Sequence, residues 1–386
     1  MKQSFNEASL WIASQTSATT GFYTIKNLFT APKHYEEAMK KYSHLIKKTF
    51  MSDDKVVLRS QMILCALATS IPLFIGLYFQ QLPVAIYGGL TGYFLTVFDQ
   101  QGTFIHRLQA NTVSYLMLVL GFIAGLHFQQ HPYELLIILG IMAYWVGVMG
   151  GEGAELEQAA LFTTIQILIA ANSVYIGSEA ASYVLMYSLI SYAIVIITTV
   201  CYFTMNKKVA SVPSLLTSFK RPLISELELH LHAISYSVTA LLSTCLMQYW
   251  SIERGYWAVV TVLLILKPDR MQSLYRNIQR IVGTCLGALV CIGIVYFIPH
   301  VLSMIIIIAC CAGFVPWAMK RNYWFVSFLI SIIVLLLLEL PAAHHGEIGT
   351  PVIRLKATIY GSILSLFGVA LSKLLDVFFI GRKKCQ

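Results

Sequence analysis

The chain has 386 residues, of which 57% are hydrophobic and only 12% are charged, and its mean hydropathy is +0.71. A soluble domain averages about 25% charged residues, so this chain cannot cover itself with a polar surface and needs lipid around it. Twelve membrane spans of about 20 residues would use roughly 240 residues, which excludes a sizeable separate soluble enzyme domain.

The net charge of +9 would suit nucleic acid, but the position of the charge argues against that partner. Lys and Arg gather in short loops beside apolar runs, which is a signal of membrane topology rather than a phosphate-binding face. The eight cysteines mostly lie inside apolar runs, and none forms a CxxC pair. We therefore expect no nucleic acid partner, no disulfide framework and no zinc site.

Residues 1–58 form a polar, Lys-rich segment. The stretch from His34 to Phe50 carries apolar side chains at helical spacing, which predicts an amphipathic helix on the cytoplasmic surface of the membrane. A helix packed against the inner ends of the bundle is the alternative.

Twelve apolar runs follow, and they predict an all-α polytopic membrane protein. A basic linker at 205–228 separates six of them from the other six. The runs are 59–79, 83–98, 108–128, 133–149, 158–176, 181–204, 229–250, 255–267, 280–298, 300–319, 323–340 and 352–375. Because six crossings return the chain to its starting side, 59–204 and 229–386 are predicted to be parallel six-helix repeats, the second with a short basic tail.

The positions of the 27 Lys and Arg residues predict the orientation. With the N-terminus in the cytoplasm, all of them except Arg254, Arg354 and Lys356 fall in cytoplasmic segments or helix ends. Cytoplasmic loops of membrane proteins are enriched in Lys and Arg. We therefore expect both termini in the cytoplasm.

A fixed offset of 170 residues relates the two halves weakly. It aligns two threonine pairs and one aspartate pair, and one gap then aligns an arginine pair. The pairs are Thr69 with Thr239, Thr91 with Thr261, Asp99 with Asp269 and Arg107 with Arg276. The predicted repeat rests mainly on the matching order of spans and loops.

The second span of each half is short. Residues 83–98 contain Gly88, Gly89 and Gly92, and their counterpart, 255–266, is followed by Lys-Pro-Asp. A helix interrupted within the membrane leaves backbone groups that are tolerated only where they face a cavity or a ligand. Such segments at matching places in two repeats predict a central site of a transporter. The alternative is a tightly packed helix that uses glycine for close approach.

No GxxxxGK[ST], HExxH or GxSxG motif and no cluster of metal ligands occurs in the sequence. We therefore expect no enzyme chemistry, no catalytic residue, no cofactor and no metal. Movement of a solute would have to run on an ion gradient or down the solute's own gradient.

Two nearby stretches carry a resemblance to a known family: Tyr256 to Asp269, YWAVVTVLLILKPD, and Arg276 to Gly287, RNIQRIVGTCLG. Together they resemble the signature of the fusaric acid resistance (FUSC) family, which reads Tyr-Trp, an apolar run, Pro-Asp, and then Arg-x-x-x-Arg-x-x-Gly-Thr-x-x-Gly. The resemblance implies a bacterial inner-membrane efflux protein for organic acids, aromatic carboxylates among them. Related plant malate channels share a six-helix unit and work as dimers, so either a monomer or a homodimer is allowed here.

The first half keeps only a degenerate copy of this signature. It has Tyr87, Thr91, Asp99 and Arg107, but Asn111 stands where the second arginine would fall. Many exporters of the family also have a large cytoplasmic domain, whereas this chain has a short linker. The resemblance therefore leaves substrate choice and gating open.

Arg276 and Arg280 are four residues apart and share one face of a helix. Guanidinium groups bind carboxylates bidentately and keep their charge, so this pair is predicted to draw an anion in from the cytoplasm. Interfacial anchoring, or pairing with Asp269, is the alternative. Lys267, Asp269 and Arg270 are predicted to form a loop salt-bridge network, with direct contact to substrate as the alternative.

Arg254 and Arg354 are basic residues near the predicted outer face, where they could guide an anion toward the exit. Snorkelling to lipid headgroups is the alternative. Tyr256 and Trp257 could stack on an aromatic substrate, although Trp and Tyr also form belts at membrane interfaces.

Glu152, Glu155 and Glu157 lie in a loop on the predicted inner side and could relay protons, or simply be solvated. The hypothesis is efflux of small organic carboxylates, with membrane lipids around the bundle and proton coupling left open. A passive organic-anion channel and a non-transporting membrane scaffold are the alternatives.

Overall fold

The computed structural model of the chain describes residues 59–97, 103–150, 154–173, 178–205, 227–340 and 349–379. The predicted amphipathic helix at 34–50 and most of the predicted linker lie outside these residues. So do Asp99, Glu152 and the side chain of Glu155.

The described residues form twelve α-helices and no strand, which confirms the prediction of an all-α polytopic protein. In chain order the helices are α4 (Arg59–Tyr78), α5 (Leu82–Thr96), α6 (Phe104–Phe128), α7 (Pro132–Met149), α8 (Ala154–Ala171), α9 (Ser178–Met205), α11 (Leu227–Tyr249), α12 (Tyr256–Ile265), α13 (Arg270–Phe297), α14 (Val301–Met319), α15 (Tyr323–Glu339) and α16 (Gly349–Phe379).

The helices differ in whether they meet the length and hydropathy expected of a membrane span. Among the described residues, eight helices are long and apolar enough to cross a membrane: α4, α6, α7, α9, α11, α13, α14 and α16. The other four, α5, α8, α12 and α15, are not among these candidate spans and are called the short helices below, although α8 equals α7 in length with 18 residues. The shortest, α12, has 10 residues and spans about 15 Å, half of a bilayer core of about 30 Å.

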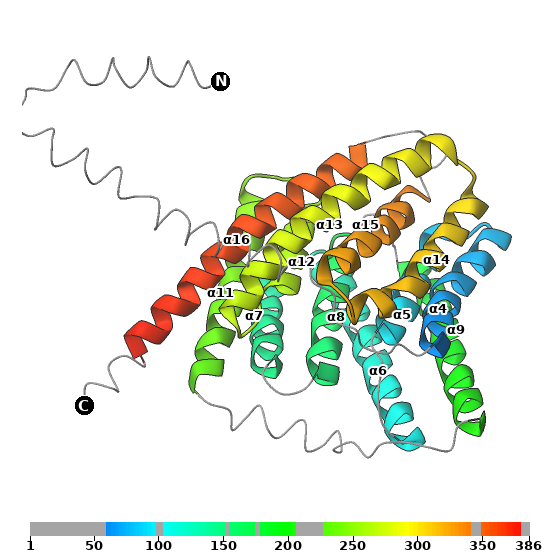
Figure 1. Cartoon of the computed structure of the whole chain (residues 1–386), viewed down its shortest axis with the longest axis horizontal. Coiled ribbons are helices and arrows are strands. Elements are labelled where there is room, and N and C mark those ends of the chain that lie inside the picture. Colours follow the sequence, from blue (N-terminus) through cyan, green and yellow to red (C-terminus); the bar gives the residue numbers. More distant parts are fainter. Residues whose placement is uncertain are drawn as a thin grey trace, which may run out of the picture. The chain divides into compact units, whose positions relative to one another are not determined.

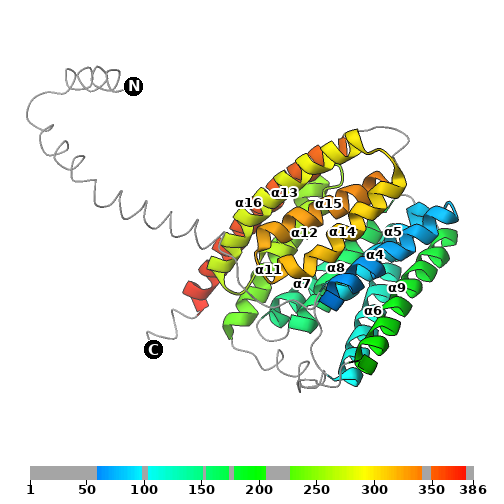
Figure 2. The ribbon, with the colours of Figure 1, turned by 45° about the vertical axis from the view of Figure 1, so that its right-hand side comes forward.

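Each short helix is packed between two long ones. In the first half, α5 contacts α4 and α9, and α8 contacts α6 and α7 (Figure 1). In the second half, α12 contacts α11 and α16, and α15 contacts α13 and α14. The halves meet where α4 packs against α14 and α7 packs against α11 (Figure 2). Two like-folded halves would give this order of contacts; the repeat itself stays a prediction.

Helix α5 runs without interruption through its glycines, so the predicted break in this span is wrong. A Cβ on Gly92 would lie 2.0 Å from the carbonyl oxygen of Ala68 on α4, and one on Gly88 would lie 2.8 Å from that of Tyr187 on α9. Small residues let helices approach closely in lipid, where apolar surface alone does not drive helix association. The alternative, glycine used for tight packing, is confirmed for α5.

Helix α12 does end early. Leu266 is extended, with φ −65° and ψ 130°, and Pro268 follows, which cannot continue a helical hydrogen-bond ladder. The next helix begins at Arg270, and the side chain of Asp269 caps it by accepting a hydrogen bond from the backbone N–H of Met271 at 2.9 Å.

Candidate functional site

A cavity of about 540 Å³, the large cavity, lies among the four short helices and the adjoining ends of α13 and α14. Its wall is mostly apolar, and it includes Phe94 of α5 and Phe162 of α8, whose rings stack with centroids 4.5 Å apart. Six charged side chains also line it, five basic and one acidic: Lys267, Arg276, Arg280, Lys320, Arg354 and Glu157. An apolar wall with a few charged groups is typical of a small-molecule site.

Two of these cations are buried without a counter-ion among the residues that the structure describes. Arg280 on α13 is 0% exposed and Arg354 on α16 is 2% exposed. No group of the described residues accepts a hydrogen bond from Nε, Nη1 or Nη2 of Arg280, or from Nε or Nη1 of Arg354. Buried charges in proteins are normally paired, because the penalty for removing an ion from water is several kcal/mol. These guanidinium groups are therefore available to an anion in the cavity.

Close packing of α13 against α15 explains why Arg280 is buried. A Cβ on Gly283 would lie 2.4 Å from the carbonyl oxygen of Trp324, and a Cβ on Gly287 would lie 2.7 Å from Cβ of Ser331. The two glycines stand one turn apart and let the helices touch along their backbones. The Arg280 side chain, one turn before Gly283, is thereby enclosed.

Aromatic side chains hold the other arginines of the large cavity. The guanidinium of Arg354 lies 3.9 Å from the ring centroid of Trp257, and that of Arg276 lies 5.0 Å from the ring centroid of Tyr323. Both aromatic residues line the cavity, and neither the indole Nε1 nor the phenol oxygen has a hydrogen-bond partner in the segments that the structure describes. The unpaired polar groups here are mainly donors, which favours an anionic ligand.

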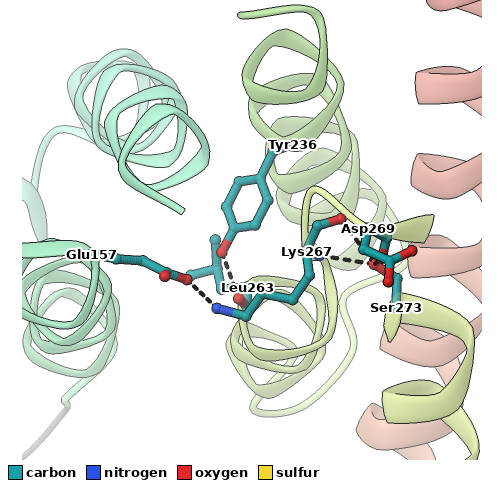
Figure 3. A network of polar contacts seen from close by, with 6 residues as sticks. All are labelled: Glu157, Tyr236, Leu263, Lys267, Asp269 and Ser273. Atoms are coloured by element: carbon teal, nitrogen blue, oxygen red, sulfur yellow. Dashed lines mark hydrogen bonds and ion pairs between the residues drawn. The ribbon is translucent and has the colours of Figure 1, made fainter. Parts of the chain in front are cut away.

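An ion pair crosses one end of the large cavity (Figure 3). The amine of Lys267 pairs with the carboxylate of Glu157 on α8, and the two side chains are 15% and 14% exposed. The backbone N–H of Lys267 donates to Oγ of Ser273 at 2.8 Å, and the hydroxyl of Tyr236 on α11 donates to the carbonyl of Leu263 on α12. These bonds fix the end of α12 against α8, α11 and α13.

A second cavity of about 460 Å³, the small cavity, lies at the opposite ends of the four short helices. Arg254, Glu253 and Tyr256 line it, together with Asn172 and Ser173 from the end of α8 and the segment after it. Four residues line both cavities: Leu90, Ile169, Trp257 and Val334.

The structure brings together five of the predicted site residues, Lys267, Trp257, Arg276, Arg280 and Arg354, around the large cavity. Arg354 was expected near an outer exit, and it lines the same cavity as Arg280. Arg254 and Tyr256 line the small cavity instead.

The remaining predicted residues have other places. Arg107, at the start of α6, lines neither cavity, and Asp269 caps α13. The predicted network of Lys267, Asp269 and Arg270 is wrong, because Lys267 pairs with Glu157 and Arg270 pairs with Asp376. Charge alone suggested neighbours in sequence, whereas the partners lie on α8 and α16.

Sequence reasoning missed Tyr323 and Gln61, which also line the large cavity. A polar residue in an apolar run was an available signal for Gln61. The Tyr-Trp pair at 323–324, at the start of α15, matches the Tyr-Trp pair at 256–257 in type, but nothing in the sequence related α15 to α12. No group of three His, Cys, Asp or Glu that could hold a metal occurs in the described part of the chain.

Residues 241–368 match the family model described as fusaric acid resistance protein-like. The match covers a third of the chain and shows what this part of it is similar to. The match contains both signature stretches and places Trp257, Arg280 and Arg354 within the family region. The predicted resemblance is confirmed, and the chain is a multi-pass membrane protein whose residues 241–368 are similar to the fusaric acid resistance family.

Relatives from several bacteria align with about a third of the chain. An uncharacterized protein of Haemophilus influenzae is 26% identical over 139 residues, ORF2 of Neisseria gonorrhoeae 27% over 139, and the inner membrane protein YccS of Escherichia coli 25% over 140. Each alignment covers 36% of this chain and 19%, 33% and 19% of the respective relative. The chain thus spans at most a third of these relatives. No solved structure matches it.

Proposed function

We propose that the chain exports small organic carboxylates, aromatic ones included, from the cytoplasm across the inner membrane. One observation carries the proposal: Arg280 and Arg354 are buried on the large cavity, and within the described part of the chain no group accepts a hydrogen bond from most of their guanidinium nitrogens. The match of residues 241–368 to the fusaric acid resistance protein-like model and the similarity to the inner membrane protein YccS support transport over catalysis.

The composition of the large cavity favours an organic anion over an inorganic one. A carboxylate can accept two parallel hydrogen bonds from a guanidinium, which offsets the cost of burying that charge. A volume of about 540 Å³ lies within the range of pockets that enclose drug-sized molecules. The stacked Phe94 and Phe162 give an aromatic body a surface to contact.

The predicted orientation supports a cytoplasmic position for the large cavity. Basic residues gather at the end of the bundle where the large cavity lies, including Lys267, Arg270, Arg276 and Lys320. By the positive-inside rule that end faces the cytoplasm. An exporter binds its substrate from the cytoplasm, so the large cavity is the expected entry site. The small cavity, with Arg254, then lies toward the exit.

The test is flux of labelled aromatic acids in vesicles that contain the purified protein, at a pH where the acids are ionised. We expect saturable flux that falls at least about tenfold in Arg280→Gln, since loss of a charged hydrogen-bond partner exceeds about 1.4 kcal/mol. Arg107→Gln, outside both cavities, is the control and should keep wild-type flux. No flux above protein-free vesicles across a panel of acids would refute the proposal.

The same vesicles separate a coupled transporter from a passive channel. Imposing a proton gradient should change the steady-state accumulation of the acid if proton movement is coupled to export. Currents in a planar bilayer that reverse at the equilibrium potential of the anion, whatever the proton gradient, would instead identify a channel.

A further inference from the structure

The two cavities adjoin each other across four side chains. Leu90, Ile169, Trp257 and Val334 are the residues that line both, and each comes from a different short helix: α5, α8, α12 and α15. We name this set the septum. The four helices that are not among the eight candidate spans are therefore the four that meet between the cavities.

The septum is apolar, and three of its members are aliphatic. Leu90 and Ile169 are each 9% exposed and Trp257 is 5% exposed, so little space remains between them. An apolar constriction stops ions and polar solutes because they would have to shed their water there. Neither cavity is thus connected to the other by a polar path through these side chains.

Trp257 is the exception in the septum, because a cation lies on its ring. The guanidinium of Arg354 is 3.9 Å from the ring centroid. It lines the large cavity, where its Nε and Nη1 have no acceptor among the described residues. A cation over an indole face is worth about 2 kcal/mol or more when it is desolvated. The contact therefore holds the ring and the guanidinium together in the closed septum.

We propose that Trp257 and Arg354 form the selectivity barrier of the pathway, which rests on the proposed export of carboxylates. A carboxylate that reaches Arg354 from the large cavity accepts hydrogen bonds from its free nitrogens and competes with the indole face for the cation. Trp257 is then released, and the anion passes toward the small cavity. A neutral solute of the same size has no group that exchanges with the indole, so the septum stays closed to it.

An aromatic substrate gains a second contact at the same place. Once Arg354 turns to the carboxylate, the indole face that it covered can stack on the ring of the substrate, and such pairs are worth about 0.5–1.5 kcal/mol beyond burial of area. The barrier therefore favours aromatic over aliphatic carboxylates of equal charge.

The test compares labelled benzoate with labelled mannitol, a neutral solute, in vesicles at pH 8. Trp257→Ala should raise mannitol permeability at least about tenfold, which corresponds to a free-energy barrier lower by about 1.4 kcal/mol. Trp257→Phe keeps a ring under Arg354 and should stay closed to mannitol. Arg354→Gln should lose benzoate flux while mannitol remains excluded.

The chain offers a matched control. Trp317 on α14 carries the guanidinium of Arg321 at 5.0 Å, yet this Trp lines neither cavity. Trp317→Ala removes a second Trp–Arg contact and should leave both solutes at wild-type rates. A mannitol leak in Trp317→Ala equal to that of Trp257→Ala would mean general loosening of the bundle and would overturn the proposal.

The outcomes for the barrier and for export are distinct. If folded Trp257→Ala excludes mannitol as the wild type does, the barrier proposal fails even where benzoate flux is present. If the wild type carries no benzoate or other acid but Trp257→Ala admits mannitol, export fails while the septum is supported as the closed point of the pathway.

Discussion

Replacing Arg280 by methionine should make the protein more stable and unable to bind substrate. Arg280 is among the largest fully buried side chains, and none of the described residues offers its side-chain nitrogens an acceptor. An arginine at the centre of a membrane helix costs about 2.5–3.5 kcal/mol on insertion scales, and methionine fills similar space without charge. We expect Arg280→Met to raise the free energy of unfolding by about 1–3 kcal/mol.

The assay is unfolding of the protein in lipid nanodiscs, with and without an aromatic acid. A ligand at 100 times its Kd stabilises the native state by about 2.7 kcal/mol, and this increment should disappear in Arg280→Met. Arg270→Met is the control, because it breaks the partly exposed pair with Asp376 and should cost about 0–1 kcal/mol with the ligand effect intact.

One result would refute the reasoning. If Arg280→Met is less stable than the wild type by more than about 2 kcal/mol and keeps the full ligand effect, then Arg280 serves the fold and not the substrate. The large cavity would then need another anion-binding group, with Arg354 the next to examine.

Two further predictions concern contacts between helices. Gly283→Ala should lower the free energy of unfolding by about 1–3 kcal/mol, because its Cβ would lie 2.4 Å from the carbonyl oxygen of Trp324. Gly293→Ala is the control and should leave the stability unchanged, since nothing lies within 4 Å of its Cβ. Thermal unfolding of both variants tests the prediction. Lys267→Glu should place two carboxylates together and lower the free energy of unfolding by about 3–5 kcal/mol. The double variant Glu157→Lys, Lys267→Glu exchanges the two charges and should recover at least half of that loss. A double-mutant cycle with no coupling energy would contradict the ion pair.

Local signals made much of the fold predictable. Each apolar run is long enough to be read without its neighbours, so the order of twelve helices was predictable. The early end of α12 was predictable too, because Pro268 and the capping Asp269 act within a few residues of the chain. The FUSC signature lies in the same segment and pointed to Trp257 and Arg280.

Glycine in α5 shows where a local reading is ambiguous. Gly88 and Gly92 are compatible with a broken helix and with a helix in close contact, since both need a missing side chain. Only the tertiary structure shows that α5 is a helix in close contact, because Ala68 on α4 and Tyr187 on α9 lie against these glycines.

The sequence alone determined that the protein lies in a membrane and how its helices follow one another. The burial of Arg280 and Arg354 appears only in the tertiary structure. The tertiary structure decided which of these charges meet: Arg354 on α16 with Trp257 on α12, and Lys267 with Glu157 on α8. The physical reason is the distance along the chain between the residues involved. Hydropathy and helix ends are set by residues a few positions apart, whereas a cavity and its septum are made by side chains from helices that are distant in the chain.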